Sequence, residues 1–437
     1  MHWKHGKIIA GSLALLGSAL VSAPASAHGS DPGRAVLGQG DGWAAATTGT
    51  TGGAHAAPGD VYTVSERSQL AAALRAHPGA PKIIYVRGTI DGNVDAQDRP
   101  MSCEDFADPG YSLPAYLARY DPATWGKAPV TGPLEEARAR SQRNQAAQVV
   151  LDVGSNVTIV GLGGDNVRAT LRGLNLRVVG DNVILRNLRF EDAHDCFPQW
   201  DPNDGATGNW NSEYDNVTLF GASHVWVDHN EFSDGTDTDP PEYFGMKYEI
   251  HDGLLDIVNG SDLVTVSYDK LHDHDKSMLI GSTDKPTYDV GKLRVTLHHN
   301  LFSNLGQRVP RVRYGQVHVY DNLYLVPDAA SYTYSLGVGV ESRIYAENNF
   351  FRIPDTPDLL PLGNIVKYWK GTALHATGSL VAAGSRHPRP VDLVAEYNAA
   401  YDPDLGGDVG WTPTLVPRLD PAFEVPARVL SGAGPGH

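Results

Sequence analysis

Cysteine is scarce in this chain, with only Cys103 and Cys196 among 437 residues. Stability therefore has to come mainly from a hydrophobic core, which an apolar content of 41% can supply. An even number of cysteines fits one disulfide if the protein is exported, and two buried free thiols are the alternative. We predict a Cys103–Cys196 bond that tethers a long loop to the body of the domain.

Long hydrophobic runs are also lacking, with one exception near the N-terminus. Residues 8–21 are largely apolar and follow Lys4 and Lys7, but about fourteen residues are too few to span a bilayer. Ala25-Ser26-Ala27 then supplies the small residues that a signal peptidase accepts. We predict a signal peptide over 1–27 and a secreted, extracellular protein with no membrane partner; an uncleaved anchor is the alternative. The mature chain, 28–437, is expected to be a single domain.

Positive charge is in short supply, because 35 Lys and Arg residues face 51 Asp and Glu residues, giving a net charge of −16. This balance argues against nucleic acid as a partner, since nucleic acid selects basic surfaces. It also conflicts with binding of a polyanion, unless positive charge is concentrated in one cleft and a bound cation adds to it.

The first part of the chain shows little repetition. Residues 28–60 are rich in Gly, Ala and Thr and are expected to form an irregular N-terminal arm. Ser65 fits the N-cap of a short helix over 66–75, and 82–90 fits a first strand. Residues 100–130 are expected to form an ordered loop with turn residues, and the polar segment 135–145 fits a helix.

From about residue 148 the pattern changes to short β-rich runs separated by Gly, Asn and Asp: 149–153, 157–160, 174–179, 183–188, 217–220, 225–227, 263–266, 293–297, 317–320 and 343–345. Three of these runs fit the template apolar-x-apolar-x-x-Asn and end at Asn230, Asn300 and Asn322. Looser matches end at Asn348 and, with Asp in place of Asn, at Asp269. Successive ends lie 39, 31, 22 and 26 residues apart.

This spacing is typical of a parallel β-helix, in which a coil takes roughly 20–30 residues and extra residues form loops on one face. Asn after a strand tolerates the left-handed conformation of a sharp turn, and stacked Asn side chains can form a ladder. A β-sandwich would need hairpin turns every 8–12 residues, and few suitable Asn-Gly or Asp-Gly pairs are present. We predict an all-β fold, a right-handed single-stranded parallel β-helix with long loops on one face.

Aspartates cluster in two segments: Asp201, Asp204 and Asp215 in the first, Asp252 and Asp256 in the second. Calcium prefers several oxygen ligands, mostly carboxylates and waters. In an extended strand Asp252 and Asp256 would lie about 13 Å apart, so a shared ion requires a bend between them, for which Gly253 is suited. Asp215 could complete the set from a neighbouring coil. Solvated aspartates in turns are the alternative.

A zinc site is one interpretation of the run HDHDK at 272–276. His272 and His274 would lie on one face of a strand, as metal-binding imidazoles can. However, Lys276 would share that face and repel the ion, and no third ligand has a convincing spacing. We therefore do not predict zinc there.

Arginines gather in QRVPRVR at 307–313. Arg311 and Arg313 alternate within a strand, and Pro310 separates them from Arg308 because proline disrupts strand regularity. Guanidinium groups bind carboxylates in a forked geometry, so a groove that also contains Lys276 would suit a uronic-acid polymer. Solvated surface charge is the alternative.

At these residues the chain resembles the bacterial, calcium-dependent pectate lyases of polysaccharide lyase family one. The resemblance covers roughly residues 40–400. The similar stretches are WAAATTGTTGG (43–53), YDPATWGK (120–127), EEARARSQRNQ (135–145), FPQWDPNDG (197–205), GNWNSEYDN (208–216), HVWVDHNEFSDG (224–235), HDG (251–253), HDHDKS (272–277) and LHHNLFSNLGQRVPRVRYGQVHVYDNLY (297–324).

The resemblance implies a calcium site. Asp215, Asp252 and Asp256 match the family's primary calcium ligands. Asp204 matches an aspartate that helps to hold additional calcium when substrate is bound.

The resemblance also implies the roles of the basic residues. Lys276 and Arg313 match residues that grip substrate carboxylates, and Arg308 matches the proposed catalytic base. Arg311 is a further substrate-binding candidate.

The implied reaction is β-elimination in α-1,4-linked polygalacturonate, which gives 4,5-unsaturated products. Because arginine normally stays protonated, an alkaline optimum is expected. The rivals are a calcium-independent pectin lyase, a glycoside hydrolase with paired carboxylates and a non-catalytic carbohydrate-binding β-helix. A monomer is expected, because a capped β-helix can be self-sufficient.

Overall fold

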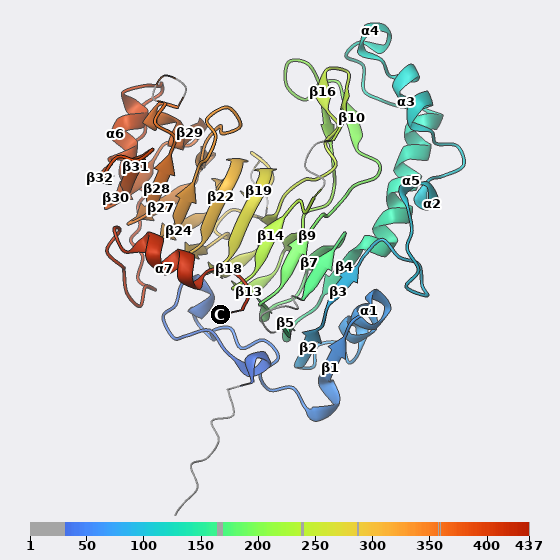
Figure 1. Ribbon diagram of the computed structural model, residues 1–437, viewed down its shortest axis with the longest axis horizontal. Coiled ribbons are helices and arrows are strands. Elements are labelled where there is room, and N and C mark those ends of the chain that lie inside the picture. The colour runs from blue at the N-terminus through green and yellow to red at the C-terminus, as the bar shows by residue number, and fades with distance from the viewer. Residues whose placement is uncertain are drawn as a thin grey trace, which may run out of the picture. The chain divides into compact units, whose positions relative to one another are not determined.

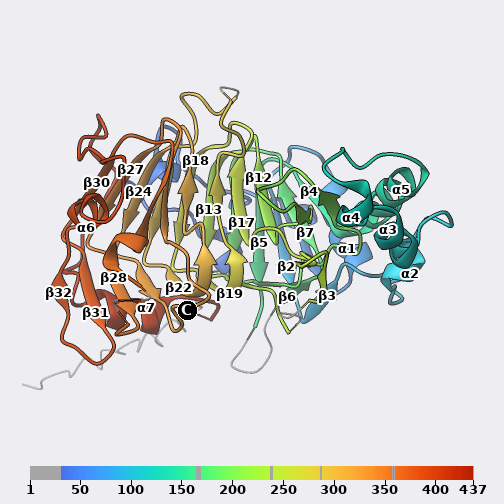
Figure 2. The same ribbon diagram turned by 90° about the horizontal axis from the view of Figure 1, so that it is seen from above.

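The chain winds through three parallel β-sheets in a constant order, and from β5 onward each turn of the winding adds one strand to each sheet. The computed structural model describes residues 31–163, 169–236, 240–285, 288–356, 358 and 360–436. Figures 1 and 2 show the strands stacked side by side along the length of the domain. The predicted right-handed parallel β-helix is confirmed.

The described residues of the three sheets align in parallel register, except for the antiparallel end strand β32. Sheet 1 contains β1 (Val61–Val64), β2 (Lys82–Val86), β5 (Val157–Gly161), β8 (Val183–Arg186), β13 (Ser223–Asp228), β18 (Asp262–Ser267), β21 (Val295–His298), β24 (Gln316–Tyr320), β27 (Arg343–Glu347) and β30 (Leu374–Thr377). Sheet 2 contains β3 (Thr89–Asp91), β6 (Thr170–Arg172), β9 (Arg189–Glu191), β14 (Glu231–Ser233), β19 (Lys270–Lys276), β22 (Leu301–Gln307), β25 (Leu323–Leu325), β28 (Phe350–Ile353), β31 (Leu380–Ala383) and β32 (Arg389–Pro390). Sheet 3 contains β4 (Val150–Val153), β7 (Asn175–Val178), β12 (Val217–Phe220), β17 (Leu255–Val258), β20 (Leu279–Ile280), β23 (Arg311–Val312), β26 (Leu336–Gly339) and β29 (Val366–Trp369).

The interior of the coils is filled by aligned aliphatic side chains. In sheet 1 one row of paired, fully buried residues runs across the strands: Val183, Val225, Val264, Val295, Val317, Ile344 and Leu374. β-branched residues suit this position because they pack well on a pleated surface that is buried. The same residue type therefore recurs once per coil, which is the repeat seen in the sequence.

A ladder of side chains fixes the corner between sheets 1 and 2. The side-chain oxygens of Asp269, Asn300, Asn322 and Asn349 each accept a hydrogen bond from the backbone N–H of the ladder residue one coil earlier, starting at Asn230. The predicted ladder is confirmed at its first four positions. The last position was predicted one residue too early, because the frame that fits is Ile344-x-Ala346-x-x-Asn349 and not one ending at Asn348.

The left-handed conformation at this corner does not fall on the ladder residues themselves. It falls on the residue immediately before each of them: His229, Tyr268, His299, Asp321 and Asn348. The expectation that the asparagine at the end of each frame itself takes the left-handed conformation was therefore wrong. The ladder asparagines are required for their hydrogen bonds, and the preceding position accepts several residue types.

Long segments leave the coils at the corner between sheets 2 and 3. The first contains α2 (Cys103–Phe106), α3 (Leu113–Arg119), α4 (Pro122–Trp125) and α5 (Pro133–Val149). Two later ones contain the hairpins β10–β11 (Gln199–Asp201, Asn209–Asn211) and β15–β16 (Glu242–Tyr243, Met246–Lys247). Buried aromatic residues, among them Tyr116, Trp200 and Trp210, join these segments. Figure 1 shows α3–α5, β10 and β16 rising together beside the sheets.

Four local predictions need correction. Segment 100–130 is not a loop but contains three short helices, and the predicted helix 135–145 extends over Pro133–Val149. Segment 82–90 forms β2 and β3, and β1 precedes it. Helix α1 (Arg67–Arg75) has Glu66, and not Ser65, as its N-cap. Alternation alone did not reveal these breaks, because tertiary packing decides where short elements end.

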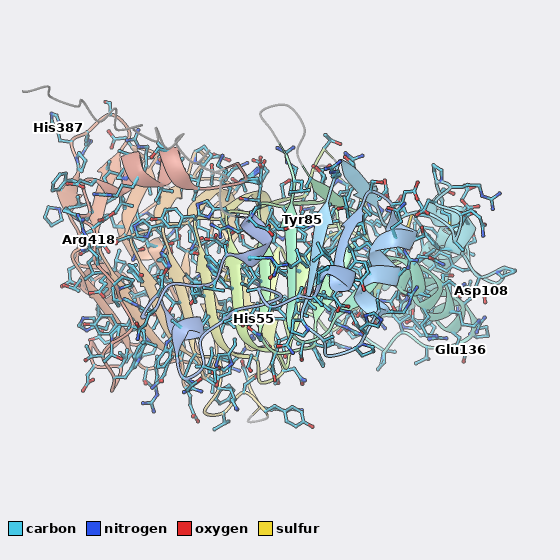
Figure 3. The ribbon with its side chains drawn as sticks, turned by 90° about the horizontal axis from the view of Figure 1, so that it is seen from below. His55, Tyr85, Asp108, Glu136, His387 and Arg418 are labelled. Carbon is cyan, nitrogen blue, oxygen red and sulfur yellow. A yellow bond between two sulfur atoms is a disulfide. The ribbon has the colours of Figure 1, made fainter. Side chains whose placement is uncertain are left out.

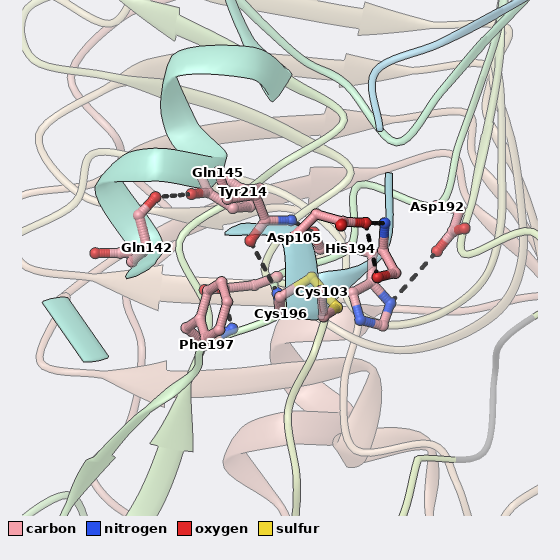
Figure 4. Close-up of a disulfide and its surroundings, with 11 residues drawn as sticks. Cys103, Asp105, Gln142, Gln145, Asp192, His194, Cys196, Phe197 and Tyr214 are labelled. Carbon is pink, nitrogen blue, oxygen red and sulfur yellow. Dashed lines mark hydrogen bonds and ion pairs between the residues drawn. A yellow bond between two sulfur atoms is a disulfide. The ribbon is translucent and has the colours of Figure 1, made fainter. Parts of the chain in front are cut away.

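The disulfide joins Cys103 of α2 to Cys196, which follows β9, and the two Cα atoms are 5.3 Å apart. Figure 4 shows this bond beside the side chain of His194. The helical insertion is thereby attached to the loop that leads into the β10–β11 hairpin.

The ends of the chain cover the outside of the coils. The N-terminal arm contains η1 (Pro32–Arg34), η2 (Trp43–Ala45) and η3 (Pro58–Asp60), and its backbone N–H groups bond to Thr158, Thr265 and Thr296 on sheet 1. Figure 3 shows His55 of the arm on the same face as Tyr85 of β2. Near the other end lie η4 (Leu362–Ile365), α6 (Leu393–Asn398) and α7 (Val425–Gly432), and α7 packs on sheet 2. Among the described helices, none combines the length and apolar character that a membrane span requires.

Replacing Asn300 by Ala should destabilise the coil stack. Asp269 N–H loses its acceptor and Val266 C=O loses its donor, both at buried positions. Each unsatisfied buried group costs about 1–3 kcal/mol, so a loss of about 3 kcal/mol in unfolding free energy is expected. Denaturant unfolding of this variant and of Asn203→Ala, which removes one exposed hydrogen bond, provides the measurement. Equal losses in the two variants would contradict a special role for the ladder.

Candidate active site

The predicted site residues come together where the coils pass from sheet 2 into sheet 3. Asp215 lies just before β12, and Asp252 and Asp256 lie before and within β17. Lys276 ends β19, and Arg308 lies between β22 and β23. Because β12, β17, β20 and β23 are neighbours in sheet 3, the winding brings these distant residues into one region.

The three aspartates are arranged around Gly253. The amide of Gly253 donates to Asp215 Oδ1 at 2.9 Å, and the Leu279 amide donates to Asp256 Oδ1 at 2.8 Å. A Cβ atom at position 253 would lie 2.7 Å from Asp215 Oδ1 and 2.8 Å from Asp256 Oδ1, so only glycine leaves room for both carboxylates. The chain bends at Leu254, next to the predicted bend, before β17 begins.

Negative charge in this trio is poorly compensated. Burial, with the charges of Asp256 and Asp252, raises the pKa of Asp215 well above its usual value. Burial and the charge of Asp252 raise the pKa of Asp256 to about 7, although Arg308 and His274 act in the opposite direction. A set of carboxylates that resists ionisation in this way is suited to a bound cation, and oxygen donors are what calcium prefers.

Lys276 sits beside the trio. Its Nζ atom lies 3.8 Å from Asp252 Oδ1 and 3.5 Å from Glu249 Oε2, and only 11% of its side chain is exposed. Glu249 was not predicted from the sequence. It lies in an irregular segment and belongs to no recognisable motif, and only the nearby Lys247 distinguishes it. It also pairs with Lys247, so it holds two lysines near the aspartates.

Arg308 occupies a left-handed backbone conformation with φ of 59°. Within the described part of the chain, its buried Nε atom has no hydrogen-bond partner. A non-glycine residue held in this conformation, with an unsatisfied donor, is typical of a functional site.

Arg311 lies in β23, and Arg313 directly follows that strand. Arg311 lies over the Trp369 ring at 4.0 Å, and burial with the charges of Arg313 and Arg308 lowers its pKa to about 10. Arg313 donates from Nε to Asp284 and from Nη1 to Gly281 C=O. Sequence reasoning missed Trp369 and Asp284, since the first ends strand β29 and the second lies in the segment between β20 and β21, and the two share no motif.

Asp204 and the HDHDK run are placed differently from these residues. Asp204 is exposed in the turn of the β10–β11 hairpin, which forms a two-stranded sheet of its own. His272 bonds to Asp273 and Glu231, whereas His274 bonds to Asp234 and to Asp252 C=O. The two histidines therefore face different partners and do not form a shared metal site.

Comparison with known proteins gives concordant results. A family model described as pectate lyase matches residues 130–396. The pectate lyase of Bacillus subtilis strain 168 is 47% identical over 419 residues, which cover 94% of this chain and 96% of that protein. The chain belongs to the pectate lyase family.

Further pectate lyases are similar over most of the chain. Pectate lyase E of Dickeya chrysanthemi is 35% identical, covering 85% of this chain and 83% of that protein. A solved pectate lyase bound to a hexasaccharide has a TM-score of 0.87 and 46% identity, covering 93% of this chain and 99% of the other. The pectate lyase of Acidovorax avenae subsp. citrulli has a TM-score of 0.83 and 34% identity, covering 94% and 98%. The protein is thus a polysaccharide lyase of the pectate lyase type, and the rival functions are not favoured.

We expect calcium to stabilise this pectate lyase more at pH 8 than at pH 5. In the folded protein Asp215 and Asp256 keep their protons to higher pH than in the unfolded chain, so without a cation stability falls as the pH rises from about 4 to about 7. If calcium is held by the ionised carboxylates, protons should compete with it below about pH 7. At pH 8 and a hundredfold excess of calcium over Kd, the gain should be about 3 kcal/mol.

Thermal unfolding with calcium and with chelator at both pH values measures this gain. The variant Asp256→Asn should lose most of it. The control Asp195→Asn removes another buried carboxyl with a pKa of about 7, and should keep it. A gain that is equal at the two pH values, or that survives in Asp256→Asn, would contradict the assignment.

Proposed function

We propose that this protein is a secreted pectate lyase that cleaves α-1,4-linked D-galacturonan by calcium-dependent β-elimination. One arrangement carries the proposal: the Asp215–Asp252–Asp256 trio lies next to the cationic groups of Lys276 and Arg308. A cation site and fixed positive charge together suit a polymer that has one carboxylate on every sugar.

The chemical difficulty is the proton on C5 of the sugar. This proton is weakly acidic, because the adjacent carboxylate is already negative. A base removes it, the C4–oxygen bond breaks with its electron pair, and the leaving oxygen takes up a proton. The product has a 4,5 double bond at its new non-reducing end.

The donor set of the aspartate trio fits calcium. Asp215, Asp252 and Asp256 would hold the ion, and Asp204 would help to hold a further ion when substrate is present. An ion held by these residues would supply positive charge beside the substrate carboxylate, and would so stabilise the negative charge that develops when C5 loses its proton.

Arg308 is the proposed base. To accept the C5 proton its guanidine must be neutral, so the rate should rise toward alkaline pH. Burial and the charges of Arg313 and Arg308 lower the pKa of Arg311 to about 10, so positive charge is concentrated around the proposed base.

Lys276, Arg313 and Arg311 are the proposed substrate-binding residues. Asp284 and Gly281 C=O fix two nitrogens of Arg313 and so orient its guanidinium group. An ordered guanidinium loses less rotamer entropy when it binds a carboxylate. Stacking on Trp369 orders Arg311 in the same way.

Export is part of the proposal. The predicted signal peptide, 1–27, lies outside the described residues. The Cys103–Cys196 disulfide suits an oxidising compartment, as expected for a protein that acts outside the cell. The mature enzyme, residues 28–437, is proposed to be a monomeric single domain without nucleic acid or membrane partners.

Ultraviolet absorbance of the unsaturated product during incubation with polygalacturonate tests the function. A rise that needs calcium and stops on addition of chelator is the expected result. A rise on methyl-esterified pectin alone, insensitive to chelator, would indicate a pectin lyase instead. New reducing ends without absorbance would indicate hydrolysis, and neither signal would indicate a binding protein.

The variant Arg308→Lys tests the base. Loss of general-base catalysis should lower kcat by about 10²–10⁴-fold with little change in KM. Arg294→Lys is the control, because Arg294 pairs with Asp262 and lies over Trp43 of the N-terminal arm. A rate that peaks at acidic pH, or an Arg308→Lys enzyme with normal kcat, would contradict the role of Arg308.

A further inference from the structure

Three groups of potential metal-binding side chains occur in the described part of the chain, in addition to the aspartate trio. Each brings three donor atoms within 4.8 Å of one another: Cys103 with His194 and Cys196, Asp192 with His194 and His251, and His299 with Asp321 and Asp420. The sulfurs of the first group are bonded to each other. In the third group Arg428 Nε lies 2.6 Å from Asp420 Oδ2, where its positive charge opposes a cation. The second group has neither defect.

We propose that Asp192, His194 and His251 form a binding site for a divalent transition-metal ion such as Zn²⁺. Asp192 Oδ1 lies 3.0 Å from His251 Nε2 and 3.9 Å from His194 Nδ1. Ligands at about 2.1 Å in tetrahedral geometry are separated by about 3.4 Å, so these distances bracket the required spacing. Figure 4 shows His194 with its ring turned toward Asp192.

The backbone holds the three donors in place. Asp192 has a left-handed φ of 57°, and the His194 amide donates to Asp192 C=O at 2.7 Å, which closes a tight turn. The Asp195 amide donates to Ile250 C=O, and so joins this turn to the segment that carries His251. The disulfide at Cys196 anchors the turn further.

A second carboxylate lies behind His251, within ion-pair distance of its ring. Its Nδ1 atom is 3.6 Å from Asp234 Oδ2, and Asp234 Oδ1 lies 2.7 Å from Nδ1 of His274. A carboxylate behind a metal-binding imidazole fixes the ring and raises its basicity, which is the usual arrangement in metal sites. Lys247, whose charge also reaches Asp234, has its Nζ atom 3.5 Å from Glu249.

The donor chemistry separates this site from the aspartate trio. Two imidazole nitrogens with one carboxylate favour zinc, copper or nickel, whereas three carboxylates favour calcium. The side chains of Asp192 and His194 are 29% and 24% exposed, so water can complete the coordination. His251 directly precedes Asp252, and His274 bonds to Asp252 C=O at 2.8 Å, so an ion here would be linked to the trio.

Calorimetric titration of the full-length mature protein with ZnCl₂, in buffer with saturating calcium, tests the site. Calcium keeps the aspartate trio occupied, so the wild-type protein should still bind one Zn²⁺. His194→Ala should weaken binding by at least about 100-fold, because the loss of a ligand exceeds the usual cost of losing an outer-shell partner. His272→Ala is the matched control, since His272 is 26% exposed and also contacts carboxylates.

Electron paramagnetic resonance with Cu²⁺ as the probe identifies the ligands. Hyperfine coupling to two imidazole nitrogens is expected in the wild type and in His272→Ala, and coupling to one in His194→Ala. The proposal is overturned if calcium abolishes Zn²⁺ binding, if His194→Ala binds as tightly as the wild type, or if His272→Ala loses binding equally. These readouts do not depend on lyase activity, so their outcome is separate from that of the proposed function.

Discussion

The hydrogen bonds between ladder side chains and the backbone of the preceding coil set the register on which the rest of the molecule depends. Each ladder residue from Asp269 to Asn349 accepts from the amide one coil earlier, so every coil must be in phase with its neighbour at this corner. Because the ladder fixes the corner between sheets 1 and 2, a coil with extra residues has to form its loops at another corner. The segments with the helices and the two hairpins leave between sheets 2 and 3, where the site residues also lie, and the segment between β20 and β21 leaves between sheets 3 and 1.

The site brings buried carboxylates and a cluster of arginines close together, in a protein whose net charge is strongly negative. Buried Asp215 and Asp256 resist ionisation, and three arginines crowd close enough for the pKa of Arg311 to fall. A protein with net charge −16 can therefore present a local cluster of cationic side chains, because low polarity strengthens local charges while distant surface charges are screened. A calcium ion would offset the negative charge of the aspartates, and the carboxylates of a uronate polymer would offset the positive charge of the arginines.

The segment that carries Asp252 and Asp256 also carries His251, which belongs to a second set of metal donors. This second set, Asp192, His194 and His251, favours a different kind of metal ion from the aspartate trio. Segment 251–256 contributes His251 to the nitrogen-rich set and Asp252 and Asp256 to the oxygen-rich set. Asp234 and His274 lie between the two, since His274 bonds both to Asp234 and to the backbone at Asp252. Two cations of different chemistry could thus be held by one rigid framework, because both sets are mounted on loops pinned by the coils and by the disulfide.

The repeated apolar frames and their terminal Asn residues determined the β-helix, because each coil must present the same residue types at the same phase. The arginine and aspartate clusters were also visible in the sequence, and the resemblance assigned their roles. Only the tertiary structure decided that Gly253 must lie between Asp215 and Asp256, that Asp284 orients Arg313, and that Asp192 meets His194 and His251. Those contacts depend on which loops of different length meet at one corner, and periodicity does not encode the path of a loop. Hydrogen bonds and burial in the folded chain fix that path, so no local pattern could have revealed it.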